Sequence, residues 1–178
     1  MAYTTINKST DYFNTKLYTG NDTDGHSITG VGFQPDLCWF KVRDFAASHA
    51  LVDSIRGTSK TLRTDTSSPD FTSSAGTDFS SFDSDGFTVD NVELFASYNF
   101  SGANIVTWNW LAGGTASSNT DGSITSTVSA NTTAGFSIVS YTGNGSAGAT
   151  IGHGLGVTPA MIIVKNRTEA TSWCVAHK

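Results

Sequence analysis

Clusters of cationic residues are absent from this chain. Its 178 residues include 10 Lys and Arg against 15 Asp and Glu, which gives a formal net charge of -5 and a pI of about 5.1. Proteins that bind nucleic acid neutralise phosphates with grouped Lys and Arg side chains. We therefore expect no nucleic-acid partner.

Cysteine and long apolar runs are also scarce. Cys38 and Cys174 are too few for a disulfide framework and lack metal-ligand spacing, and Cys38 is expected to be a small buried hydrophobic residue. No apolar run approaches the roughly 18 residues of a membrane span. The first ten residues, MAYTTINKST, lack the apolar segment of a signal peptide. We expect a soluble chain, made in a cytoplasm and not inserted in a membrane.

Glu, which favours helices, is scarce in this chain, whereas Asp, which favours turns, is abundant. Asp outnumbers Glu by 13 to 2, Ser and Thr together number 49, and Gly numbers 18. Asp favours caps and turns over helix interiors, and Thr favours strands. The composition therefore predicts an all-β chain with very little helix.

Apolar or alternating runs of strand length are separated by turn signals. One helical turn is predicted within Asp44–Asp53, and the run Asp36–Val42, apolar on both faces, is predicted as a central strand. Many short strands with intervening turns indicate an antiparallel β-sandwich or jelly-roll-like fold. The predicted strands cover residues 11–20, 36–42, 86–95, 104–111, 123–129, 135–143 and 160–166.

The strand NIVTWNWL at 104–111 alternates regularly. Val106, Trp108 and Trp110 share one face, and Thr107 and Asn109 share the other. Because two tryptophans bury a large apolar area, we predict that the Trp face points into the core.

The chain repeats itself. At a shift of 123 positions, Phe13, Tyr18 and Gly20 fall on Phe136, Tyr141 and Gly143, and after a one-residue insertion near His153 a shift of 124 aligns Pro35, Lys41 and Arg43 with Pro159, Lys165 and Arg167. The shared Gly, Pro and Tyr residues set backbone geometry. We predict a complete unit over residues 1–130, and the start of a second, incomplete copy over residues 131–178.

The second copy is too short to bury both faces of its strands. It must dock on the first unit, dock on another chain as inter-subunit strands, or connect to the rest of a longer polypeptide. These three alternatives stay open at the level of sequence.

Four motifs stand out along the chain: PDLCWFK, DSIRG, FDSDGF and TWNW. Together they resemble a repeated domain in virion structural proteins of tailed phages of marine bacteria, and the resemblance covers nearly the whole chain. One departure is KVRD in the first unit, where the second unit has the usual KNR. The resemblance implies a tail fibre or other particle appendage, located in the virion after assembly in the host cytoplasm, with no known catalytic residues.

Three acidic turns, at 21–25, 83–86 and 119–122, favour hairpins, because Asp and Gly tolerate positive φ. The competing hypothesis is a Ca²⁺ site that uses Asp22 and Asp24, or Asp83 and Asp85. None continues into an EF-hand pattern, and we expect no cofactor.

Catalysis lacks a motif. The four histidines are scattered, without a nucleophile at the spacing of a known triad, and the GNGSAG segment at 143–148 is not followed by the helix of a dinucleotide site. We expect that the protein is not an enzyme.

The candidate binding residues are aromatic and paired polar side chains. The long segment 64–81 is predicted to be a surface loop, either functional or a mere connection. Phe71 and Phe79 of this loop, with Tyr98, are candidates for stacking on sugar rings, and Asp53 and Arg56 form either a polar binding pair or a structural tie.

The sequence therefore predicts a virion structural protein that works by subunit assembly. Its expected partners are other virion proteins and further copies of itself, with a trimer favoured. The alternative is a lectin-like module that binds glycans of the host surface and serves host adhesion.

Overall fold

The computed structural model describes residues 6–73, 78–90 and 98–178. These residues form open antiparallel β-sheets, with one 3-10 turn at Ser9–Asp11 and no α-helix among them. The prediction of an all-β, sandwich-like fold with very little helix is confirmed. Within the described ranges, no helix is both long and apolar enough to span a bilayer.

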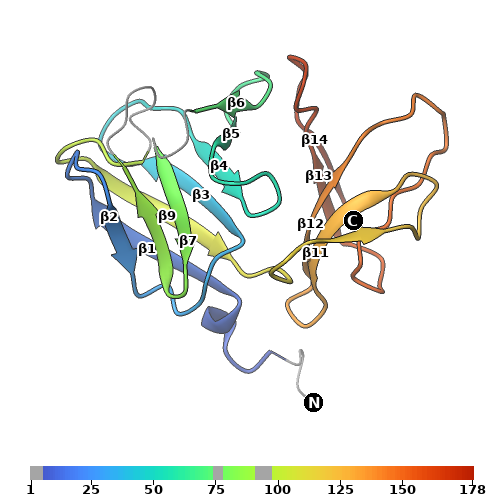
Figure 1. Ribbon diagram of the computed structural model, residues 1–178, viewed down its shortest axis with the longest axis horizontal. Helices are drawn as coiled ribbons and strands as arrows, with labels where there is room; N and C mark the ends of the chain where they lie inside the picture. Colours follow the sequence, from blue (N-terminus) through green and yellow to red (C-terminus); the bar gives the residue numbers. More distant parts are fainter. Residues whose placement is uncertain (1–5, 74–77, 91–97) are drawn as a thin grey trace.

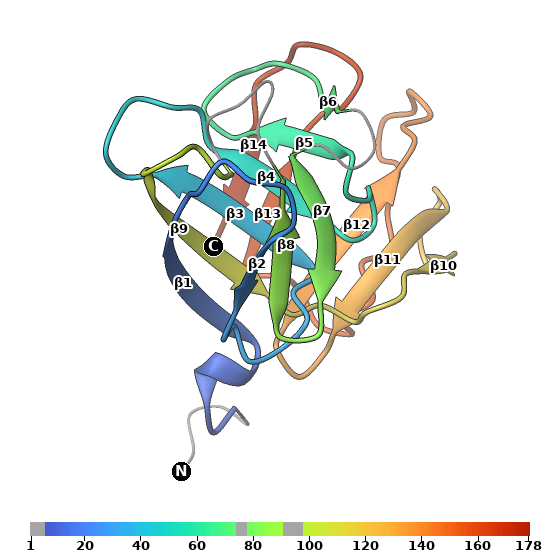
Figure 2. The ribbon, with the colours of Figure 1, turned by 60° about the vertical axis from the view of Figure 1, so that its left-hand side comes forward.

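Strands β1 to β9 form the first unit, which has two layers (Figures 1 and 2). The larger sheet has six strands in the order β1-β9-β3-β4-β5-β6, and the smaller sheet has the order β2-β8-β7. The strands are β1 Phe13–Thr19, β2 His26–Thr29, β3 Leu37–Val42, β4 Ala50–Asp53, β5 Lys60–Arg63, β6 Phe71–Thr72, β7 Phe79–Asp83, β8 Gly86–Val89 and β9 Asn104–Trp110.

The core lies between these two layers. Strand β3 pairs with β9 on one side and β4 on the other, as predicted for a central strand. Its side chains alternate, so Cys38, Phe40 and Val42 point into the core with no exposed surface. The ring of Phe40 packs edge-on against Phe79 and Phe87 at centroid distances of 6.0 and 5.2 Å. Burial in this apolar layer raises the pKa of the Cys38 thiol well above its usual range, and the nearby Asp36 raises it further.

The prediction for the faces of β9 is wrong. Ile105, Thr107 and Asn109 point into the core and are fully buried, whereas the tryptophan face is half-buried on the outside of the sheet. The donors of Asn109 are used inside the core, by Thr107 and by the backbone, whereas its Oδ1 is buried without a hydrogen-bond partner among the described residues. Asn109 Nδ2 donates to Thr107 Oγ1 at 3.0 Å and to the carbonyl of Asn14 at 3.1 Å.

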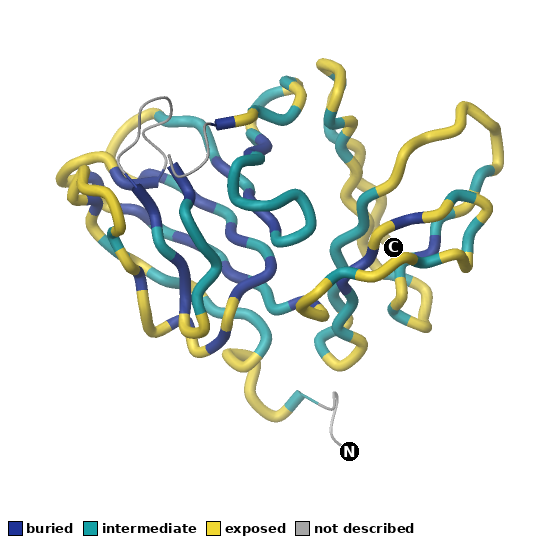
Figure 3. Tube along the Cα trace, in the orientation of Figure 1, coloured by how far each residue is buried: buried dark blue, intermediate teal, exposed yellow. Residues whose placement is uncertain are grey.

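Strands β10 to β14 form the second unit. β10 Ser117–Asn119, β11 Ser126–Asn131 and β12 Phe136–Tyr141 form one sheet, and β13 Met161–Val164 pairs with β14 Cys174–His177 in a separate hairpin. The predicted division at residue 130 falls inside the β11–β12 pair, so strands assigned to the first copy lie in the sheet of the second unit. Figure 3 shows that this unit is mostly exposed or half-buried, unlike the first.

The sequence repeat has a counterpart in strand pairing. In the first unit Leu37 pairs with Asp53 and Phe40 with Ala50. In the second unit Met161 pairs with His177 and Val164 with Cys174. All four positions differ by 124 residues, so the β13–β14 hairpin has the register of β3–β4, while β12 corresponds to β1 at a shift of 123.

Two local predictions need correction. No helical turn forms in Asp44–Asp53, because Ala50–Asp53 pairs in register with β3 as strand β4. The segment 64–81 is not a mere loop, because β6 and the start of β7 lie within it. The strand predicted over 86–95 exists as β8 from Gly86 to Val89, and its second half lies outside the described residues.

Replacing Phe40 with Ala tests the core. The side chain has no exposed surface, so the Phe40→Ala variant should lose about 3–5 kcal/mol in the free energy of unfolding, measured by chemical denaturation. Phe45→Ala is the matched control, because Phe45 is 41% exposed and should cost under about 1 kcal/mol. Equal losses in the two variants would contradict the assigned core.

Candidate functional site

An aromatic groove lies on the outer face of the larger sheet. Neighbouring strands β3 and β9 place Trp39 opposite Trp108 in register, with ring centroids 5.5 Å apart. Trp110 and His49 complete the lining of a shallow hollow of about 310 Å³, whose walls are almost wholly apolar. The groove exists because alternation sends the polar residues of β9 inward and its tryptophans outward.

Two contacts orient the groove. The indole nitrogen of Trp39 donates a hydrogen bond to Thr64 Oγ1 at 3.1 Å. Trp110 lies between two phenylalanines, with Phe13 at 4.9 Å and Phe136 at 6.1 Å between ring centroids. Phe13 and Phe136 are equivalent positions of the repeat. Because Phe136 belongs to β12 of the second unit, the groove ends where the two units meet.

The second unit docks on the segment that follows β5. Lys165 Nζ donates to the carbonyl of Ser67 at 3.1 Å, and the indole nitrogen of Trp173 donates to the carbonyls of Arg63 and Thr66. Of the three alternatives left open by the sequence, docking on the first unit is therefore present in the structure.

Arg167 adds a charged contact at this junction. Its Nε lies 3.1 Å from Asp70 Oδ2, and its carbonyl accepts a hydrogen bond from the Asp70 amide at 2.9 Å. These contacts are polar and partly exposed, so they position the second unit without covering its apolar surface.

That apolar surface is the second candidate site. On β13, Met161, Ile162 and Ile163 are 52%, 48% and 54% exposed. Their counterparts in the first unit include Cys38, which is fully buried between the two layers. An exposed apolar strand pair of this kind is typical of an interaction surface.

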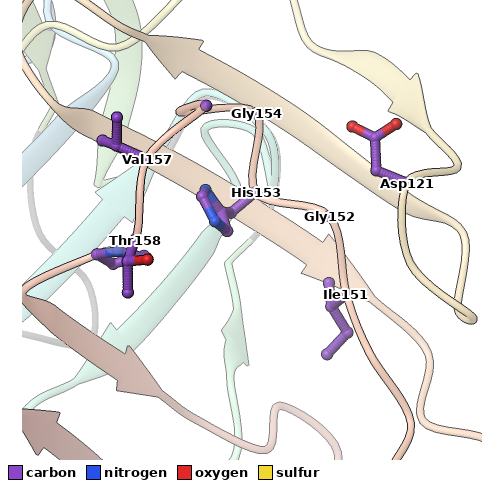
Figure 4. A pocket seen from close by; sticks show the side chains of 9 residues that line it. Asp121, Ile151, Gly152, His153, Gly154, Val157 and Thr158 are labelled. Atoms are coloured by element: carbon purple, nitrogen blue, oxygen red, sulfur yellow. The ribbon is translucent and has the colours of Figure 1, made fainter.

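A second hollow, of about 570 Å³, is the third candidate site. It lies in the second unit and is lined by the loop 151–159 and Asp121. Figure 4 shows the imidazole of His153 in the middle of this hollow and the carboxylate of Asp121 at its edge. His153 Nδ1 accepts a hydrogen bond from the Leu155 amide at 3.2 Å, which assigns the ring proton of the neutral form to Nε2. Asp121 instead accepts from Asn119 at 3.0 Å within its own turn. No nucleophile is aligned with these groups among the described contacts.

The predicted sugar-stacking aromatics lie in other places than expected. Tyr98 and Phe79 are core residues, 0% and 1% exposed, so they offer no binding surface. Burial also raises the pKa of the Tyr98 hydroxyl, which shares a hydrogen bond of 2.6 Å with Thr61. Phe71 lies in β6 and is half-buried.

The Asp53–Arg56 pair is a structural tie. Arg56 Nε lies 2.5 Å from Asp53 Oδ2, and the two side chains are 3% and 7% exposed. Arg56 also donates to the carbonyls of Leu51 and Lys60, which closes the turn between β4 and β5. The interpretation as a polar binding pair is corrected, because the guanidinium is buried and its donors are used inside the fold.

The carboxylates proposed for Ca²⁺ take part in turns. Asp85 accepts from the amides of Gly30 and Gly32 at 2.9 and 2.6 Å, and Asp83 accepts from Ser81 and Thr88 hydroxyls at 2.7 Å each. In the described part of the chain, no three His, Cys, Asp or Glu side chains group as metal ligands.

Asp22 and Asp24 lie in an exposed turn, in which Asp22 has a positive φ of 57°. Asn99, which is fully buried, holds this turn. Its carbonyl accepts from the Asp22 amide at 2.9 Å, and its side chain bonds to the Asn21 amide at 3.0 Å and to His26 Nδ1 at 2.7 Å. The hairpin prediction is wrong for this turn, because it connects β1 of the larger sheet to β2 of the smaller sheet. The acidic residues here belong to a turn between the two layers.

The groove and the exposed hairpin were missed as sites at the level of sequence. Trp39 and Trp108 are indistinguishable from core residues by type alone, and the signal that separates them is the neighbouring Thr107 and Asn109 pair, whose side chains bond to each other inside the core. The hairpin could have been found from the repeat, because its β13 residues align with the apolar run of β3.

Replacing Asp85 tests the structural role of the acidic turn. The amides of Gly32 and Gly30, together with Lys16, hold the pKa of Asp85 below its ordinary value of 3.8. A carboxyl group with a lowered pKa stabilises the fold above pH 3.8, and this contribution disappears as the pH falls through the folded-state pKa. Asp85→Ala should therefore lower Tm at neutral pH, by a difference from wild type that narrows in strong acid.

Thermal scans from pH 7 to pH 2 measure this difference. Glu169→Ala, which removes an exposed carboxylate of the second unit, is the control and should leave Tm unchanged. A pH-independent difference for Asp85→Ala would rule out the carboxylate as its cause.

Comparison with known proteins assigns the chain to a family of unknown function. No curated protein and no solved structure matches the chain. One family profile, described as "Domain of unknown function (DUF7483)", matches residues 8–178. The chain therefore belongs to the DUF7483 family.

Proposed function

We propose that this protein is a structural component of a tailed-phage virion, such as a tail fibre or another particle appendage, and that it works by subunit assembly. The observation that carries the proposal is the exposed apolar surface of the β13–β14 hairpin, on which Ile162 and Val164 are exposed although their counterparts Cys38 and Phe40 are core residues of the first unit. The motif resemblance to virion structural proteins supplies the particle type.

The energetics favour assembly. Apolar surface left in water is unfavourable by roughly 25 cal/mol per Å² relative to burial, and β13 alone exposes four consecutive apolar side chains. Val175 of β14 adds a fifth, at 59% exposure. Covering this surface with another subunit stabilises the complex without changing the first unit, which is a complete sandwich by itself.

A second candidate function is the binding of host-surface glycans. The observation that favours it is the Trp39–Trp108–Trp110 groove, because exposed indole faces stack on the apolar faces of sugar rings. The lining includes one polar side chain, His49. The groove lies on the first unit, so glycan binding and assembly through the second unit are compatible.

Absolute mass in solution tests the assembly proposal. By size-exclusion chromatography with light scattering, the wild-type chain should form a closed oligomer, with a trimer favoured, through its exposed apolar hairpin. A double variant, Ile162→Asp with Val164→Asp, should shift it to monomer, because charges then enter the apolar contact. Leu17→Asp is the control, since Leu17 is 57% exposed on the first unit.

Wild-type chain that stays monomeric at all concentrations, or a double variant that assembles as wild type does, would count against the proposal.

A glycan array tests the alternative. Reproducible binding of the wild-type chain that falls at least about tenfold in Trp39→Ala and Trp108→Ala would support a sugar site in the groove. Phe100→Ala removes an aromatic ring that is 49% exposed and serves as the control. An array without reproducible hits, or equal losses in all three variants, would eliminate it.

A further inference from the structure

The second unit has an open position between β12 and β13. In the first unit, β9 lies between β1 and β3 and pairs with both along most of its length. The equivalents of β1 and β3 are β12 and β13. In the described residues these two strands share no ladder and belong to separate sheets. Figures 1 and 2 both place the β13–β14 hairpin beside β12.

The backbone of β13 faces this position. The Lys178 amide donates to the Ala160 carbonyl at 3.0 Å, which makes Ala160 and Lys178 a hydrogen-bonded pair. Because such pairs alternate along an antiparallel ladder, Ile162 and Val164 bond to β14 while Met161 and Ile163 direct their amides and carbonyls to the other side.

The first unit shows the same arrangement with the position filled. The Arg43 amide donates to the Asn104 carbonyl of β9 at 2.8 Å, which places the odd-numbered residues of β3 toward β9. Shifted by 124 residues, these become Met161, Ile163 and Lys165.

The backbone of β12 is also available. The Leu111 amide donates to the Tyr12 carbonyl, so the even-numbered residues of β1 bond to β9. Shifted by 123, these include Ser137 and Val139. β11 pairs with β12 along its other edge over Phe136–Tyr141, and the Gly135 amide donates to the Asn131 carbonyl in the turn that joins the two strands.

One end of the position is closed by the first unit. Asp70 bonds to the Arg167 carbonyl, and Arg167 Nη1 reaches across to Ser140 Oγ of β12 at 2.9 Å. The Arg167 side chain thus links the segment after β13 to β12. The unpaired edge of the hairpin extends from Met161 to Lys165.

We propose that this open position is an acceptor site for one β-strand of a partner polypeptide, which inserts antiparallel to both β12 and β13 as β9 does in the first unit. This inference rests on the proposed function in assembly and names its partner chemistry. The required strand alternates like β9, with small or β-branched residues toward the unfinished core and large apolar residues on the outer face.

A second copy of this chain cannot donate its own β9 at low cost. That strand is central in a six-stranded sheet, and Ile105, Thr107 and Asn109 are fully buried beneath it. Withdrawing it would dismantle the core of the donor. The proposed occupant is therefore not β9 of a second copy but a partner strand with the same alternation.

The experiment uses the full chain labelled with ¹⁵N and a synthetic peptide of residues Asn104–Gly113, NIVTWNWLAG. NMR titration should show saturable shifts confined to Ser137–Tyr141 and Met161–Lys165. A scrambled peptide of the same composition, which lacks the alternation, is the peptide control and should give none.

Paired proline variants locate the edge. Ile163 and Val175 face each other across the hairpin, and their amides point to opposite outer edges. Ile163→Pro removes a donor from the acceptor edge and should weaken peptide binding roughly tenfold or more. Val175→Pro makes the same change on the far edge and should bind as wild type does.

Equal thermal unfolding of the two variants establishes that both fold. Three results would each overturn the acceptor site: no saturable binding of the peptide, equal binding by both proline variants, or chemical-shift changes outside these strands. If the peptide fails while Ile162→Asp with Val164→Asp still abolishes oligomers, assembly stands and the strand acceptor falls. If Ile163→Pro instead abolishes oligomers without any peptide binding, a second copy occupies the position and the partner named here is wrong.

Discussion

The insertion of β9 between β1 and β3 is the interaction on which the first unit depends. It joins the start of the chain to the central strand and supplies Ile105, Thr107 and Asn109 to the core. The same insertion sends Trp108 and Trp110 outward, so the aromatic groove is a consequence of how the core is closed. Asp36 secures the end of β9 by accepting from the Ala112 amide at 2.8 Å.

The second unit shows what the same scaffold looks like without that strand. β12 and the β13–β14 hairpin keep the register of their counterparts, but the apolar residues that β9 and the smaller sheet would cover stay in water. Polar contacts from Lys165, Arg167 and Trp173 hold the unit against the segment 63–70. The contacts that position the second unit are therefore separate from the contacts that would cover its apolar residues. This separation is the physical basis for proposing assembly.

The sequence predicted strands β1, β3 and β9 of the larger sheet and the repeat, because Gly, Pro and Tyr positions that set turns are readable without tertiary contacts. It missed β4, β5 and β6, which are short and lack a regular alternation. It placed the central strand correctly from its two apolar faces. It reversed β9, because two tryptophans outweigh Thr107 and Asn109 in any burial argument, and only tertiary contacts show that Asn109 Nδ2 bonds to Thr107 and to the Asn14 carbonyl inside the core. Tyr98 and Phe79 were predicted to be exposed because their neighbours in the sequence are mostly polar. Only tertiary contacts show that both side chains are buried in the core.

Amide hydrogen exchange compares the two copies most directly, in the isolated chain kept monomeric by dilution. The account predicts strong protection for Trp39 and Lys41, whose amides bond to β9, and fast exchange for Ile163 at the equivalent position of β13. The amides of Ile162 and Val164, which bond to β14, should exchange more slowly than that of Ile163. Protection of Ile163 as strong as that of Trp39 would show that the edge is already paired and would contradict an incomplete second unit.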